Sequence, residues 1–173
     1  MEQWDQAHRA LLGELFAACH AAGLRLIANA AAHPAQTWDK LLPVVDGLTW
    51  EMPLHPNTLA DTKRVTAELR AYRRALDAGK FIGLIPLLGA AGGTERNEHL
   101  CAVAAMLVRE PGEPLAVSPR GSVPAKRDWF DWPARLGKPK APHQRAGDVL
   151  RREFERGTVT LDVGRREAQA RFE

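Results

Sequence analysis

Hydrophobic positions along the chain repeat with helical and strand periods in alternating segments. Residues 4–21 place Leu12, Leu15, Phe16 and Cys19 on one helical face, and Gly23 is expected to end this helix. Short apolar runs predict strands over 24–30, 46–56, 81–88 and 114–118. Helical patterns separate these runs, one capped by Thr37, one running from Asn57 or Thr58 to Ala78, and one capped by Thr94. The alternation predicts successive strand–helix units and a parallel sheet.

The second strand segment, DGLTWEMPLHP, carries an acid between two apolar residues. At a period of two, Leu48, Trp50 and Met52 point to one face, while Thr49 and Glu51 point to the other. If helices cover the first face, Glu51 points toward whatever the sheet encloses.

The C-terminal third has a different pattern. Residues 123–142 are rich in Pro, Lys and Arg, which is typical of a linker or of a long loop over a barrel mouth. The tail RREFERGTVTLDVGRREAQARF then predicts strands, with Gly157 and Gly164 at the turns.

The composition is typical of one globular domain and does not indicate a particular class of binding partner. The chain has 173 residues, 45% hydrophobic and 26% charged, with a net charge of +3. The arginines are scattered, so nucleic-acid binding is only weakly favoured. Cys19 and Cys101 lie in apolar helical patterns and are expected to be buried thiols. No metal-binding His/Cys spacing and no serine-nucleophile elbow occur.

Membrane association and export leave no visible signal in these residues. No run reaches the roughly 18 apolar residues of a membrane span, and the N-terminus carries early acids, unlike a signal peptide. A longer protein could still carry a leader, and the sequence does not predict the cellular compartment.

The order of units predicts an α/β fold that corresponds to part of a (β/α)8 TIM-type barrel. About four parallel strands with helices, over residues 1–148, would form half of a barrel whose full size is about 250 residues. Residues 149–173 would add a C-terminal β-hairpin that packs on it. A flavodoxin-like sheet is the alternative, but GLIPLLGAAGG lacks the spacing of a phosphate-binding loop.

Several short motifs occur in an order that resembles a known family. A helix with an early Trp (QWDQAHRALLGELFAAC) precedes a strand ending in Asn (LRLIANA), then DGLTWE, an Arg-rich helix, and the tail RREFERGTVTLDV. This order resembles the C-terminal portion of bacterial TIM-barrel glycoside hydrolases of the polygalactosaminidase-like group. In that group the R-x-F-x-x-G-x-V tail is a hairpin after the barrel. The chain departs from the pattern at Asp162, where Asn is usual, and in lacking the first half of the barrel.

The resemblance implies specific roles. Glu51 takes the place of the acid at the end of the sixth barrel strand, and Asn29 the polar position at the end of the fifth. It implies hydrolysis of glycosidic bonds in a polysaccharide, without metal or organic cofactor. Such hydrolysis generally needs two carboxyl groups. Because the second would lie in the absent half, the chain is expected to be a fragment with little activity alone.

Other residues are candidates with open alternatives. Glu51 itself could be an exposed or salt-bridged strand-end acid. Asn29 could contact a substrate hydroxyl or cap the following turn, and His55 could line the barrel mouth or lie in an exposed loop. Trp129 and Trp132, in DWFDW, could stack on sugars or anchor the long loop as a hydrophobic plug.

The acids near Glu51 in sequence are not expected to pair with it. Asp46 would lie at the opposite, N-terminal end of its strand, on the stability face of a barrel. Asp61, Glu68 and Asp77 are expected to be solvated on their helix.

Two other functional classes remain open. The chain could be a non-catalytic half-barrel that assembles with another half-barrel or with itself, because open sheet edges are rarely left bare. A weaker alternative is a nucleic-acid binder that uses the arginines of the tail: Arg145, Arg151, Arg152, Arg156, Arg165 and Arg166.

Overall fold

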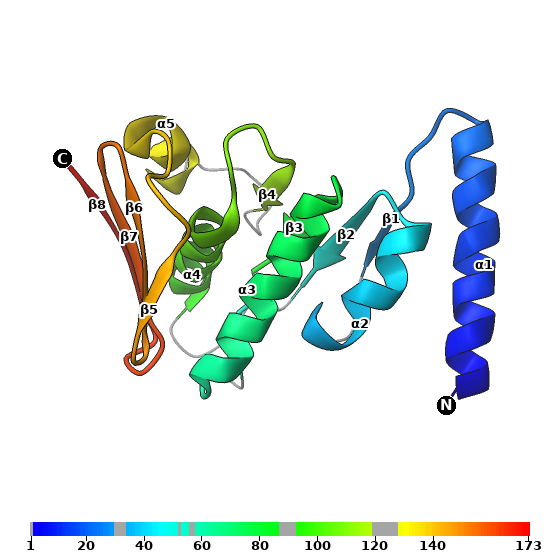
Figure 1. Cartoon of the computed structure of the whole chain (residues 1–173), viewed down its shortest axis with the longest axis horizontal. Coiled ribbons are helices and arrows are strands. Elements are labelled where there is room, and N and C mark those ends of the chain that lie inside the picture. The colour runs from blue at the N-terminus through cyan, green and yellow to red at the C-terminus, as the bar shows by residue number, and fades with distance from the viewer. Residues whose placement is uncertain (1, 30–33, 52, 56–57, 87–92, 119–127) are drawn as a thin grey trace.

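The computed structural model describes residues 2–29, 34–51, 53–55, 58–86, 93–118 and 128–173. In this part of the chain, the β-strands form two sheets of four strands each, and α-helices pack around them. The elements follow the long axis of the molecule almost in chain order, from helix α1 (Glu2–Ala21) at one end to strand β8 (Glu167–Phe172) at the other (Figure 1). The fold is therefore a mixed α/β structure.

The first sheet is parallel, and its spatial order β1-β2-β3-β4 is the order of the sequence. Ala28 pairs in register with Leu48, Leu48 with Ile82, and Ile82 with Leu115. This confirms the prediction of successive strand–helix units. The strands are β1 (Ile27–Asn29), β2 (Gly47–Trp50), β3 (Phe81–Leu84) and β4 (Leu115–Val117), and α2 (Pro34–Leu41), η1 (Leu42–Val44), α3 (Thr62–Asp77) and α4 (Gly93–Val108) connect them.

The two faces of the parallel sheet differ. Leu48 and Trp50 are buried on the face that the helices cover, whereas Thr49 is half-buried on the other face. The predicted alternation is thus confirmed for these three residues, and Met52 lies outside the described residues. On the second face Ile27 is 48% exposed.

Glycines on the second face make room for an aromatic ring. A Cβ on Gly47 would come within 2.7 Å of the Phe81 Cβ, and one on Gly83 within 3.3 Å of the Phe81 Cε1. Phe81 therefore lies across both neighbouring positions and covers part of this face.

The second sheet is antiparallel and is larger than the predicted hairpin. It has the order β5-β6-β7-β8, and β5 adds residues before position 149. Apolar side chains on one face pack against α4, which lies between the two sheets (Figure 1). The strands not yet given are β5 (Gln144–Ala146), β6 (Val149–Phe154) and β7 (Gly157–Asp162).

The R-x-F-x-x-G-x-V tail motif has a structural explanation. Arg152 is 2% exposed and donates to the carbonyls of Met106 and Arg109 at the C-terminal end of α4, at 3.2 and 2.7 Å. Phe154 and Val159 are buried in the same core. Gly157 has φ of 144°, and a Cβ there would lie 2.1 Å from the Arg171 carbonyl oxygen. The motif docks the second sheet onto α4.

Several predicted boundaries are wrong by a few residues. Helix α3 begins at Thr62, because the Asp61 side chain accepts from the Lys63 N–H at 2.8 Å and caps the helix there, not at Asn57 or Thr58. Helix α2 begins at Pro34 and not after Thr37. In residues 123–142, the described part contains η2 (Asp128–Asp131) and α5 (Trp132–Leu136) in place of a continuous loop.

The C-terminal end of helix α1 is joined to the parallel sheet through Asp46. Asp46 accepts from the Leu26 N–H at 2.8 Å and bonds the His20 ring at 3.0 Å. The Leu26 hydrogen bond, with that of His20, holds the pKa of the Asp46 carboxyl below its ordinary value. Asp46 thus has the structural role expected at the N-terminal end of β2.

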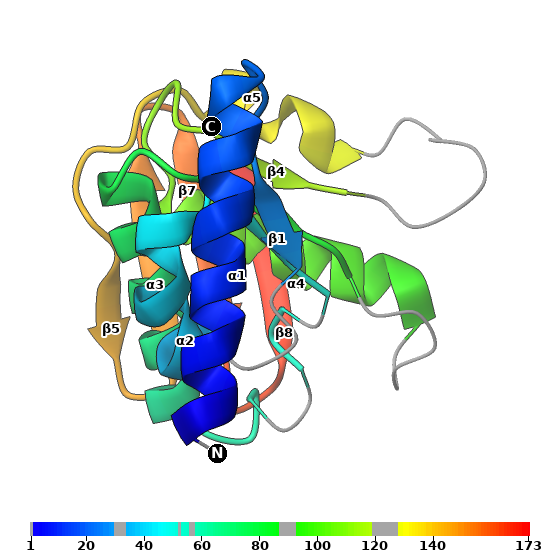
Figure 2. The same ribbon diagram turned by 90° about the vertical axis from the view of Figure 1, so that its right-hand side faces the viewer.

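The apolar face of α1 is incompletely covered. Leu11 and Leu15 are exposed, and so are Leu24 and Ile27 beyond the helix (Figure 2 views the molecule from this end). Cys19 is half-buried, so the prediction of a buried thiol is wrong for Cys19 and confirmed for Cys101. Among the described helices, none is long and apolar enough to cross a membrane.

Candidate functional site

Two of the predicted site residues meet at the carboxyl ends of neighbouring strands. Asn29 is the last residue of β1, and Glu51 follows the last residue of β2. The Asn29 Nδ2 donates to the Glu51 Oε1 at 2.8 Å, and both side chains are exposed. Because parallel strands end at the same edge of a sheet, β1 and β2 bring together residues that are far apart in the sequence.

A buried carboxylate anchors the segment that follows Glu51. Leu54 has a φ of 52°, in the left-handed region, and its N–H donates to the Glu68 Oε1 at 3.0 Å. Glu68 is fully buried, so the expectation that it is solvated is wrong. The Tyr72 hydroxyl donates to the same oxygen. The hydrogen bond from the Leu54 N–H to Glu68 therefore holds in place the segment that follows Glu51.

Burial sets the protonation state of two groups near this anchor. Burial, together with the Glu68 carboxylate, raises the pKa of Tyr72 well above its ordinary value. Burial also raises the pKa of the Cys101 thiol, with further contributions from Glu68 and Glu98. Tyr72 is thus a neutral hydrogen-bond donor, and Cys101 is not a reactive thiolate.

His55 lies on the same segment as Leu54. Its carbonyl accepts from the N–H groups of Thr58 and Leu59 at 2.7 and 2.9 Å, which forms a turn. The residue is half-buried. His55 therefore stays a candidate substrate contact on the segment that carries Glu51.

Trp129 and Trp132 lie in a different part of the molecule. Both side chains are buried; Trp132 stacks on the His99 ring at 5.7 Å and meets the Phe172 ring edge-on. Helix α5, which begins at Trp132, lies beside the antiparallel sheet and not beside β1 and β2 (Figure 1). This burial favours the anchoring alternative over a sugar platform and leaves Phe130 as the exposed ring of DWFDW.

The segments that follow the four parallel strands contain few acids. Only the segment between β2 and α3 contains any, Glu51 and Asp61. Asp61 is the N-cap of α3. Between the ends of the four strands and the helices that follow them, Glu51 is therefore the one acid that does not cap a helix.

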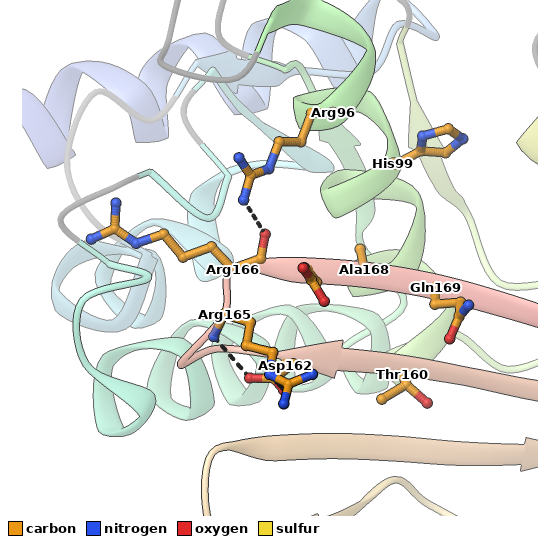
Figure 3. Close-up of a pocket in the computed structure, with 9 residues that line it drawn as sticks. Arg96, His99, Thr160, Asp162, Arg165, Arg166, Ala168 and Gln169 are labelled. Atoms are coloured by element: carbon orange, nitrogen blue, oxygen red, sulfur yellow. Dashed lines mark hydrogen bonds and ion pairs between the residues drawn. The ribbon is translucent and has the colours of Figure 1, made fainter.

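A cavity of about 610 Å³ lies away from this edge. Arg96 projects from α4 toward the hairpin of β7 and β8, and His99 of the same helix also lines the cavity (Figure 3). Arg96 donates to the Arg166 carbonyl at 2.7 Å, and the Asp162 carboxylate accepts from the Arg165 N–H at 2.9 Å. The cavity borders an edge strand and not the predicted site.

Some other candidates are accounted for within the described residues. No group of His, Cys, Asp or Glu in that part of the chain could hold a metal ion. Of the tail arginines, Arg152 is buried and Arg156 donates to the carbonyls of Ala134 and Arg135. These two side chains are therefore bound within the fold, which reduces the basic surface proposed for nucleic acid.

Comparison with known proteins gives no match, either to a family model or to a curated protein. The resemblance to TIM-barrel glycoside hydrolases therefore stays a prediction from the sequence.

Proposed function

We propose that the chain is half of a (β/α)8 barrel with a glycoside-hydrolase-like site, in which Glu51 is the acid/base residue. The observation that carries the proposal is the Asn29–Glu51 hydrogen bond at the carboxyl ends of β1 and β2. In (β/α)8 enzymes the catalytic residues lie at the carboxyl ends of the strands. The sheet order β1-β2-β3-β4, which equals the chain order, is also the order of a barrel.

The chemistry requires a second carboxyl group. Two such groups stand about 5–5.5 Å apart in retaining enzymes and about 6.5–9.5 Å apart in inverting ones. In this proposal the second acid comes from the complementary half-barrel, because the segments that join the four strands to their helices contain only Glu51 and the helix cap Asp61 as acids. Glu51 would then give a proton to the leaving glycosidic oxygen and later take one from water.

Asn29 would act on Glu51 and on the substrate. Its Nδ2 fixes the direction of the Glu51 carboxylate, and its Oδ1 can accept from a sugar hydroxyl. His55 would contact substrate from the segment that Glu68 anchors through Leu54. No cofactor is needed for this reaction.

The test is hydrolysis of galactosamine and galactose polymers by the chain joined to a half-barrel that carries an acid after its last strand. Glu51→Gln should lower turnover by about 10²- to 10⁴-fold. Asp77→Asn is the matched control, because Asp77 is an exposed acid of α3 outside the site. Unchanged turnover in Glu51→Gln would remove Glu51 from the mechanism.

A second candidate function is non-catalytic assembly of half-barrels, by pairing with another half or with itself. The observation that favours it is the incomplete cover of the second face of the parallel sheet at β1, because parallel sheets are ordinarily covered on both faces. Ile27 on that face is 48% exposed, and Leu24 just before β1 is 62% exposed. Ile27→Asp should weaken association with a complementary half, whereas Phe130→Ala, an exposed ring elsewhere, should not. Equal affinity in all three proteins would exclude this face as the contact.

A further inference from the structure

The two edges of the antiparallel sheet are unequal. Strand β5 at one edge has three residues, whereas β8 at the other has six. Proteins ordinarily protect long edge strands with proline, bulges or inward-pointing charges, because unpaired backbone groups attract other strands. The residues of β8, EAQARF, include no proline, and the inward-facing Ala168 and Ala170 are small and uncharged. Within the described residues, β8 is therefore the longer of the two edges, and its charges, Glu167 and Arg171, lie on the exposed face and not on the inward one.

A cavity borders the first half of β8, at Glu167, Ala168 and Gln169. Within the described residues, β8 pairs with β7 on one side and with no strand on the other. The cavity of about 610 Å³ borders Glu167, Ala168 and Gln169 of β8 and extends to Arg96 and His99 of α4 (Figure 3). Among the described residues, a hollow thus adjoins the first half of this edge.

The sequence of β8 is complementary to itself when it is reversed. In an antiparallel pair centred on Gln169, Glu167 stands opposite Arg171 of the other copy, and Ala168 stands opposite Ala170. Glu167, Gln169 and Arg171 are exposed and alternate with the half-buried alanines, so the opposite charges share one face. Opposite charges that face each other across strands are stabilising, and like charges are destabilising.

We propose that β8 pairs with β8 of a second copy of this chain, antiparallel and centred on Gln169. The two antiparallel sheets join into one across a two-fold axis, and symmetry makes the Glu167–Arg171 contact twice. The Arg171 Nε donates to the Gln169 Oε1 at 3.1 Å within one copy, which leaves its terminal N–H groups for Glu167 of the other. This inference concerns an edge of the antiparallel sheet, whereas the proposed active site is at the parallel sheet (Figure 1). It does not depend on that site.

Charge exchange tests the proposal by sedimentation equilibrium of the full chain. Glu167→Arg and Arg171→Glu each place like charges together twice, so each should weaken the dimer at least about tenfold. The double variant Glu167→Arg/Arg171→Glu should restore dimerisation. An equimolar mixture of the two single variants should also form a heterodimer, because each charged position then meets its opposite.

Arg151→Glu is the matched control, because Arg151 is an exposed arginine on β6, inside the sheet and away from the edge. Its dimer should be as strong as that of the unchanged chain. A chain that is monomeric at about 100 µM overturns the proposal. A dimer that Arg171→Glu does not weaken, or single variants that do not combine, also overturns it, since the contact would then lie elsewhere, for example on the incompletely covered face of the parallel sheet.

Discussion

The Asn29 amide and the Glu51 carboxylate are hydrogen-bonded at 2.8 Å across the ends of two parallel strands, although 22 positions separate them in sequence. Neither side chain is buried, so the fold does not require the contact in order to shield a polar group from an apolar core. A polar pair that the backbone brings together at the rim of a sheet, without a packing reason, is a candidate for ligand binding.

Stability measurements can separate this role from a structural one. Asn29→Ala should lower the free energy of unfolding by less than about 1 kcal/mol, because the pair is exposed to water. The coupling between Asn29→Ala and Glu51→Gln, obtained from urea unfolding of the two single variants and the double variant, should be similarly small. A loss of several kcal/mol would identify the pair as a structural element of the sheet.

Glu68 should control the segment after Glu51. Glu68→Ala removes the acceptor for both the Leu54 N–H and the Tyr72 hydroxyl inside the core, which should cost about 2–4 kcal/mol. Hydrogen exchange at the Leu54 amide should become faster even under conditions where the chain stays folded.

Tyr72→Phe is the control for that experiment, since it removes one donor to Glu68 and leaves the Leu54 contact in place. It should cost about 0.5–1.5 kcal/mol and leave exchange at Leu54 unchanged relative to its neighbours. If Leu54 is equally protected in Glu68→Ala, the anchor lies elsewhere.

The organisation of the parallel sheet could be predicted because each strand–helix unit is marked locally. Alternation in residues 47–51 sets the face of each side chain, and strand ends in a parallel sheet meet at one edge. These two rules are sufficient to place Asn29 and Glu51 near each other. They do not identify a second carboxylate.

Other features could not be predicted, for identifiable reasons. Strand β5, QRA, is exposed throughout and carries no alternation of apolar residues, so only its pairing with β6 defines it. Glu68 had a usable signal, since it lies three residues after Val65 and four before Tyr72 on the apolar stripe of α3. A charged residue within such a stripe indicates a buried polar contact, and for this reason Glu68 is buried and not solvated.

Arg152 should contribute far more to stability than its neighbour. Arg152→Met leaves the carbonyls of Met106, Arg109 and Ala141 without their buried donor and should cost about 3–5 kcal/mol in urea unfolding. Arg151→Met, at an exposed ion pair with Glu153, should cost less than about 1 kcal/mol. Equal effects would mean that the guanidinium does not dock β6 onto α4.

Glu113 should make the free energy of unfolding depend on pH in the acidic range. Hydrogen bonds from Arg73, and then from the Glu110 N–H, hold the pKa of Glu113 below its ordinary value of 4.5. Because the folded pKa is the lower one, the stabilisation is present above about pH 4.5 and is lost as the pH falls through the folded value.

The comparison is between the chain and Glu113→Gln in urea at a series of pH values. At pH 7 the variant should be less stable by about 1–3 kcal/mol, and the difference should shrink below about pH 4.5. Asp77→Asn is the control, because Asp77 also binds Arg73 but is largely exposed, and it should change stability by less than about 0.5 kcal/mol. A difference that does not vary with pH would exclude ionised Glu113 as its source.

Gly157 offers a test of how closely β7 and β8 approach. A methyl group at this position would meet the Arg171 carbonyl oxygen at 2.1 Å, and the φ of 144° is already restricted to glycine. Gly157→Ala should therefore lower the free energy of unfolding by at least about 3 kcal/mol.

Gly112→Ala separates the two causes, because Gly112 has φ of 82° but no atom within 4 Å of the added Cβ. That control should cost about 1–2 kcal/mol, for the backbone conformation alone. If both substitutions cost the same in urea unfolding, the close approach of β8 contributes nothing, and β8 can move away from β7 to admit a side chain.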